Sequence, residues 1–121
     1  MRLLVVLSAL FCLQVSLASQ DCRSCGNTIT KKETGENVMP INVDVVDSLQ
    51  ECLTRTLGCR GYPGSSMTLF EWNNGNSGVS FGSVGDYVER VLQCSKGEWT
   101  LTENDYTEVI NAVECTSVPT L

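Results

Sequence analysis

Short stretches in which apolar and polar residues alternate recur along the chain, separated by clusters of glycine and asparagine. Alternation with a period of two is typical of strands that bury one face. The expected strands are 38–46, 67–72, 79–81, 87–94, 98–102 and 107–115. Short strands broken by such turns predict an all-β fold, a small antiparallel β-sandwich.

The first stretch alternates only in part. Ile41, Val43 and Val45 alternate with polar residues, so we expect these three to share a half-buried face. Pro40 cannot donate a backbone hydrogen bond, which places this strand at a sheet edge or Pro40 near the strand start.

Two periods compete over 47–59. Leu49, Leu53 and Leu57 have helical spacing, with Gly58 as a stop, whereas Leu53, Leu57 and Cys59 would share one face of a strand. The residues leave both readings open.

The strongest turn signal is 73–78, Asn-Asn-Gly-Asn-Ser-Gly, because Asn-Gly favours hairpin turns. It predicts a hairpin that returns along 79–81. In the last stretch we expect Val109, Val113 and Cys115 on one face of a single strand.

The N-terminus has one positive charge, a short apolar run and then small residues at Ser16 and Ala18. This pattern predicts a cleaved secretory signal helix over 1–18 and a single disulfide-bonded domain over 19–121. We therefore expect a secreted, extracellular protein with no stable membrane anchor after cleavage.

Of the seven cysteines, Cys12 lies in the predicted signal peptide. The others are Cys22, Cys25, Cys52, Cys59, Cys94 and Cys115. An even number in a small exported domain predicts a disulfide framework. The order Cys59, Trp72, Cys94 follows that of immunoglobulin-like sandwiches and favours Cys59–Cys94, with Cys22–Cys52 and Cys25–Cys115 as completions.

The net charge is −6, so nucleic acid is not an expected partner, nor is an anionic membrane surface. The chain has no histidine, which removes the commonest general base and zinc ligand. We expect no enzymatic activity, no cofactor and no metal site.

Three patterns suggest chemistry and have simpler explanations. The G-x-S-x-G pattern at 78–82 lacks a histidine partner. Cys22 and Cys25 have redox-motif spacing in a polar segment without the βαβ context of a redox protein. The acidic residues over 98–108 are best explained as a solvated face.

The aromatic residues are divided between core and surface. Trp72 and Trp99 are expected in the core, whereas Tyr62 sits in a Pro- and Gly-rich loop. We take Tyr62, Asn73 and Asn74 as candidate binding residues because they lie in turn-rich loops.

Three segments contain five of the six cysteines: Cys22-Arg-Ser-Cys25, Cys52-Leu-Thr-Arg-Thr-Leu-Gly-Cys59 and Leu92-Gln-Cys94-Ser-Lys-Gly-Glu-Trp99, the last of which leads to Val113-Glu-Cys115. Together these segments resemble the nematode secreted six-cysteine domains of unknown function. The resemblance covers most of 22–115. It implies an extracellular, disulfide-bonded, β-rich module, favours a strand over 47–59, and brings no catalytic residues. Sushi modules also have Gly-x-Trp before their last cysteine, but their four cysteines would leave Cys22 and Cys25 unexplained.

These observations favour a secreted non-enzymatic interaction module that binds an extracellular protein or glycan. The alternative is a secreted defence or effector protein, such as a protease inhibitor.

Overall fold

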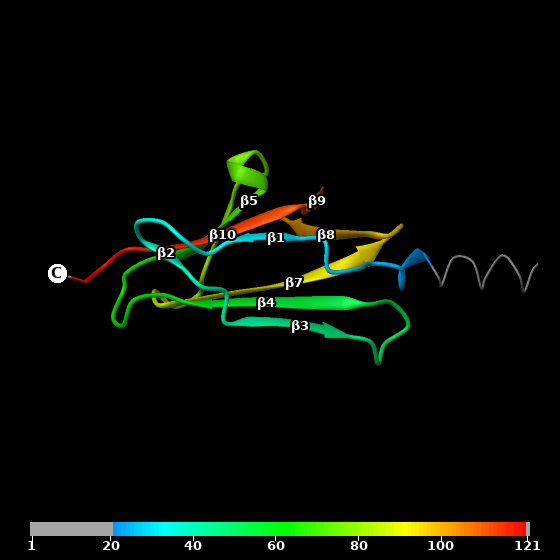
Figure 1. Cartoon of the computed structure of the whole chain (residues 1–121), viewed down its shortest axis with the longest axis horizontal. Helices are drawn as coiled ribbons and strands as arrows, with labels where there is room; N and C mark the ends of the chain where they lie inside the picture. Colours follow the sequence, from blue (N-terminus) through cyan, green and yellow to red (C-terminus); the bar gives the residue numbers. More distant parts are fainter. Residues whose placement is uncertain (1–20, 121) are drawn as a thin grey trace, which may run out of the picture.

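The computed structural model describes residues 21–120, so the predicted signal peptide and its cleavage site lie outside the described range. The elements are β1 (Thr30–Lys32), β2 (Val38–Met39), β3 (Val43–Asp47), β4 (Thr54–Arg60), β5 (Thr68–Trp72), η1 (Asn73–Gly75), β6 (Val79–Phe81), β7 (Tyr87–Ser95), β8 (Glu98–Glu103), β9 (Tyr106–Val109) and β10 (Ala112–Ser117). The predicted all-β class is confirmed (Figure 1).

The strands form two five-stranded sheets. Sheet A has the order β1-β10-β5-β6, with β2 also paired to β10, and sheet B has the order β3-β4-β7-β8-β9. The pairing of β1 with β10 is parallel, and the other pairings between these strands are antiparallel. The predicted antiparallel sandwich is confirmed, with β3 at an edge of sheet B as Pro40 indicated.

Residues 54–60 are strand β4, so the strand interpretation of this segment is confirmed. Arg55, Leu57 and Cys59 alternate toward the interior and are all buried. Threonines 54 and 56 lie between them on the outer face, where β-branched residues suit a pleated surface. Cys52 lies in a bend before the strand.

The expected face of strand β3 is wrong. Val45 pairs with Thr56 of β4 and is 58% exposed, so Val43 and Val45 face outward. Asp44 faces inward and receives hydrogen bonds from Arg55. The reason is that β4 buries an arginine, and its charge requires a carboxylate on the neighbouring strand.

The expected single strand over 107–115 is also wrong. It is divided into β9, which belongs to sheet B, and β10, which belongs to sheet A. The chain crosses between the sheets at Ile110 and Asn111, and Ile110 is buried at the crossing. Val109 is therefore on the exterior while Val113 is in the core.

Two hairpins have two-residue turns with positive φ at both positions. These turns are Lys96-Gly97 between β7 and β8 and Asn104-Asp105 between β8 and β9. Such turns match the right-handed twist of the strands. The predicted hairpin of β5 and β6 is confirmed, but it is longer, with a 3-10 turn and positive φ at Asn73 and Asn74.

All six cysteines of the predicted domain form disulfides. Cys22–Cys52 is confirmed, whereas the other pairs are Cys25–Cys94 and Cys59–Cys115. The predicted Cys59–Cys94 and Cys25–Cys115 pairs are therefore wrong.

Strand register explains why Cys59 cannot reach Cys94. Cys59 lies opposite Val88 on the adjacent strand β7. Cys94 is further along β7, roughly 20 Å away at the rise of a β-strand, and a disulfide requires Cα atoms within about 7 Å. The immunoglobulin-like order of cysteines therefore does not indicate the same bridge here.

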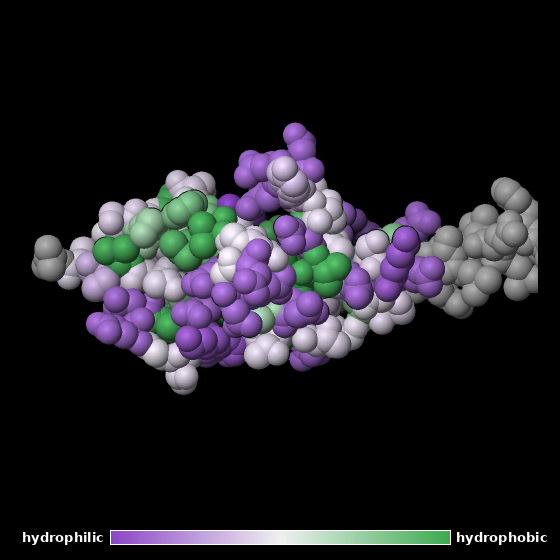
Figure 2. All heavy atoms as spheres, turned by 90° about the horizontal axis from the view of Figure 1, so that it is seen from above, coloured by the Kyte–Doolittle hydropathy of each residue, from purple (hydrophilic) through white to green (hydrophobic). Residues whose placement is uncertain are grey.

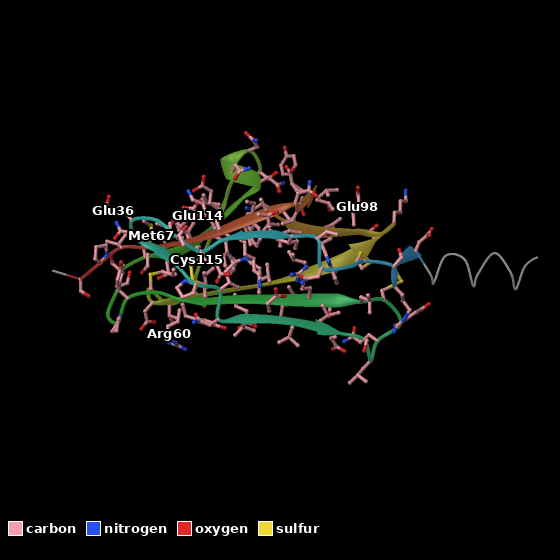
Figure 3. All side chains as sticks on the ribbon, in the orientation of Figure 1. Glu36, Arg60, Met67, Glu98, Glu114 and Cys115 are labelled. Atoms are coloured by element: carbon pink, nitrogen blue, oxygen red, sulfur yellow. A yellow bond between two sulfur atoms is a disulfide. The ribbon has the colours of Figure 1, made fainter. Side chains whose placement is uncertain are left out.

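The Cys59–Cys115 disulfide joins the two sheets through the core. Cys59 is on β4 of sheet B, Cys115 is on β10 of sheet A, and neither is exposed. Figure 3 shows Cys115 between the sheets, with Glu114 and Arg60 on the outer sides of sheets A and B. Trp72 and Trp99 are buried in the same core, as expected.

Candidate functional site

The structure places the predicted binding residues at two separate sites. Tyr62 is in the loop before β5, and Asn73 and Asn74 are in the turn after it, so they lie at opposite ends of one strand. Tyr62 is half-buried, and its hydroxyl is within 3.4 Å of the side-chain oxygen of Asn37. The three residues do not form a common surface.

The side chain of Asn73 holds the crossover between β9 and β10. Its Nδ2 donates to the carbonyl oxygen of Val109 at 2.7 Å and to the Ser77 hydroxyl at 2.8 Å. Its Oδ1 accepts from the backbone N–H groups of Asn111 at 2.7 Å and Ala112 at 3.1 Å. Asn73 thus has a structural role, while Asn74 is exposed beside it.

A contiguous apolar surface covers part of the outer face of sheet A, and we call it the apolar shelf. It is made of Val38, Met67, Leu69, Phe81, Val84 and Val118. Strand register places Leu69 beside Phe81, and Thr116 between Leu69 and Val38. Figure 2 views this face, where apolar side chains gather toward the C-terminal end of the molecule.

The shelf includes a hollow of about 310 Å³ that Met67, Phe81 and Val84 line with small residues. Phe81 is 52% exposed and Val84 is 57% exposed. Large exposed apolar side chains that cluster in this way are typical of interaction surfaces. The sequence pattern predicts the hairpin that brings Leu69 beside Phe81, but it does not predict that β10 pairs with this hairpin and brings Val38 to the same surface.

A buried hydroxyl network supports the loops around the shelf. The Ser117 hydroxyl donates to Ser65 Oγ at 3.0 Å and lies 3.1 Å from Thr68 Oγ1. Thr68 donates to the carbonyl oxygen of Gly85 at 2.8 Å, and Ser65 donates to that of Met67 at 2.8 Å. All three side chains of this network are buried, so the network holds the shelf in a preformed arrangement.

A second exposed feature is the loop between β3 and β4. Leu49 is 96% exposed within it. The Arg23 guanidinium braces the loop by donating to the carbonyl oxygens of Ser48, Gln50 and Glu51. The Cys22–Cys52 disulfide fastens the same loop to the N-terminal segment.

The loop borders a hollow of about 640 Å³, which extends to the end of β7 and includes Gln50, Gln93 and Lys96. Within residues 21–120, no group of three or more His, Cys, Asp or Glu side chains is placed to hold a metal ion. The lining of the hollow also includes Leu53 and the Cys22–Cys52 disulfide.

The serine of the G-x-S-x-G pattern belongs to the interior. Ser80 is 1% exposed, accepts a hydrogen bond from Trp72 Nε1 at 2.7 Å and donates to Glu103 at 2.7 Å. Glu103 in turn pairs with Arg90. This chain of polar contacts connects the two sheets, and it uses the one donor hydrogen of the Ser80 hydroxyl.

A second buried polar cluster centres on Arg55. Asp44 accepts from its Nε at 2.7 Å and its Nη2 at 2.8 Å, and Lys31 donates to Asp44 at 3.0 Å. The hydrogen bonds from Arg55 hold the pKa of Asp44 below its ordinary value of 3.8, against the opposing effect of burial. Arg55 Nη1 has no hydrogen-bond partner among the described residues, but the guanidinium lies over the Trp99 ring at 5.7 Å from its centroid.

Comparison of the chain with protein-family models, with curated proteins and with solved structures found no match. The resemblance to nematode six-cysteine domains therefore stays a prediction. Among residues 21–120, no helix is long and apolar enough to cross a membrane.

Proposed function

We propose that the protein is a secreted, non-enzymatic interaction module that binds an extracellular protein through the apolar shelf. The observation that carries the proposal is the exposure of Phe81, Val84 and Met67 around one hollow. Burying such side chains contributes about 25 cal/mol per Å² of apolar surface. The preformed loops reduce the ordering cost of binding.

Secretion is supported by the three disulfides and by the signal-like N-terminus. Disulfides form and persist in oxidising compartments, and they are rare in the cytosol. The partner is accordingly expected outside the cell.

A protein partner fits the shelf better than a glycan. Both tryptophans are buried, and Phe81 is the aromatic residue of the shelf. Stable protein–protein contacts centre on apolar and aromatic anchors in such hollows. Sugars would instead need several hydroxyl and amide groups directed at them. Ser66 and Ser83 supply two exposed hydroxyls beside the hollow, and the other hydroxyls there are turned inward and bonded to one another.

The test is capture of binding proteins from extracellular fluid, followed by affinity measurement with two variants. The double variant Phe81→Ser, Val84→Ser should weaken binding of the captured protein at least tenfold. Val91→Ser is the matched control, because Val91 is 50% exposed on the outer face of the other sheet. Equal affinity for the shelf variant and the original protein would contradict the proposal.

One observation favours the alternative of a protease inhibitor. Leu49 is almost fully exposed in a loop braced by Arg23 and by a disulfide, and protease inhibitors present such a residue from a rigid loop. However, bends at 49–52 depart from the extended backbone that proteases bind, which makes this the second candidate.

A panel of proteases tests this alternative. An inhibitor would slow proteases that cleave after leucine, and Leu49→Arg would redirect it toward proteases that cleave after arginine. If neither protein slows any protease in the panel, the alternative is removed.

A further inference from the structure

Strand β3 is the longest edge strand of the two sheets. It has 5 residues, against 3 in β1, 3 in β6 and 4 in β9. Figure 1 shows it at the lower margin of the molecule, beyond β4. Val45 is 58% exposed and Val46 is 47% exposed, whereas Asp44 between Val43 and Val45 is held against Arg55 on the inner face.

On two other edge strands, side chains form hydrogen bonds with backbone groups that point away from the sheet. Arg90 donates to the carbonyl oxygen of Phe81 on β6 at 2.7 Å, and Asn73 donates to that of Val109 on β9 at 2.7 Å. On β3, no side chain among the described residues bonds the backbone of Asp44 or Val46. An edge without such protection is a template for pairing with another strand.

The direction of the backbone groups on β4 follows from its flanking bonds. The carbonyl oxygen of Leu53 accepts from Cys94, and the N–H of Gly61 donates to Asp86, so odd-numbered residues of this stretch bond toward β7. The backbone N–H and C=O groups of the even-numbered residues of β4 therefore form hydrogen bonds with β3.

The register of β3 and β4 then fixes the direction of the β3 backbone. Val43 and Val45 lie opposite even-numbered residues of β4, Gly58 and Thr56, and bond to them. The backbone groups of Asp44 and Val46 consequently point away from the sheet, into solvent.

We propose that β3 pairs in antiparallel fashion with β3 of a second copy of this chain, with the two-fold axis at Val45. In this register Asp44 of each copy lies opposite Val46 of the other. Both residues have outward backbone groups, so the two pairs form four N–H···O=C bonds. The two Val45 side chains meet as a non-hydrogen-bonded pair, the type that brings side chains closest.

Charge and apolar contact together favour this register over its neighbours. Centring on Asp44 would oppose two carboxylates. Centring on Val46 would place the exposed Val45 opposite Asp47, whereas the Val45 register brings the two exposed Val45 side chains together. Asp44 points inward, a device that usually protects edge strands, but its charge is already compensated by Arg55 and Lys31.

The resulting dimer has a continuous sheet made from both copies of sheet B. On its outer face, the row Val91, Thr56 and Val45 of one copy continues into the same row of the other. Such a two-fold contact is closed and self-complementary, so it stops at two copies. The apolar shelf lies on sheet A, so the dimer can be tested independently of the proposed function.

The experiment is sedimentation velocity of the mature, disulfide-bonded protein over a range of concentrations. We expect a reversible dimer, which Val45→Lys and Val45→Glu should each convert to monomer by placing like charges at the two-fold axis. An equimolar mixture of the two variants should restore a dimer, because opposite charges then meet. Val91→Lys, at a residue 50% exposed on the same face but away from the edge, should leave the dimer unchanged.

Restoration in the mixture also shows that both variants are folded. A protein that stays monomeric at the highest concentration would overturn the proposal. So would a Val45→Lys variant that dimerises like the original, or a mixture that stays monomeric.

Discussion

Asp44 and Arg55 form a bidentate ion pair in the interior of the sandwich, with N···O distances of 2.7 and 2.8 Å. Arg55 is only 1% exposed, so its charge depends on this carboxylate, on Asn27 and on the Trp99 ring for compensation. The pair joins β3 to β4 and turns Val45 outward. It therefore connects the stability of the fold with the exposure of its edge strand.

Replacing Asp44 by asparagine should reduce the free energy of unfolding at neutral pH by about 3 kcal/mol, because it leaves a buried charge uncompensated. The folded pKa of Asp44 is lowered by Arg55. Its stabilisation is therefore present above the ordinary pKa of 3.8 and is lost as pH falls through the lower folded value.

Urea unfolding of both proteins at a series of pH values checks this. The difference in free energy should shrink in acid, and a difference independent of pH would contradict the assignment. Asp105→Asn, in an exposed turn, is the control and should change little at any pH.

Ser80→Ala should lower the free energy of unfolding by about 1–3 kcal/mol, because it leaves the buried Trp72 N–H without an acceptor. Thermal unfolding followed by tryptophan fluorescence measures the change. Ser83→Ala, at an exposed position, should be neutral. If the two variants are equally stable, the Ser80 hydroxyl contributes nothing to the fold.

Asn73→Ala should destabilise the protein by about 1–3 kcal/mol more than Asn74→Ala, because only Asn73 holds the crossover with its side chain. Both asparagines have positive φ, at 53° and 58°, so the comparison cancels the cost of placing alanine in this backbone region. Denaturant unfolding gives the difference. Equal losses would show that backbone conformation, and not the side-chain clamp, explains the effect.

Limited reduction should open the Cys22–Cys52 disulfide first and Cys59–Cys115 last. Cys52 is exposed, whereas Cys59 and Cys115 are inaccessible to a thiolate until the sheets separate. Alkylation of the partly reduced protein and peptide mapping identify the order. Early labelling of Cys59 would contradict the core position of that bridge.

Much of the fold could be predicted from local pattern. Alternation and turn residues indicated most of the strands, and the hairpin at 73–78 was expected from its asparagines and glycines. The face of β3 was predicted wrongly because Val43 and Val45 follow the apolar rule, while the neighbouring strand carries Arg55. A buried charge on another strand is invisible to a pattern read along one strand.

The candidate sites were harder to predict from the sequence than the fold. The turn-rich loops of the sequence point to Tyr62, Asn73 and Asn74, but these residues lie at opposite ends of β5. The apolar shelf combines Leu69, Phe81 and Val38 across three strands, so only strand pairing could reveal it.

The sequence by itself determined the fold class, the disulfide-bonded character and most strand positions, because these depend on residue types and on spacing along the chain. Tertiary structure alone decided which cysteines pair, which face of β3 is inside and where the apolar surface lies. These depend on which strands pair, in which register, and on what the neighbouring strand buries. The two-residue repeat of a strand specifies alternation, but it does not specify the partner strand or the residue opposite.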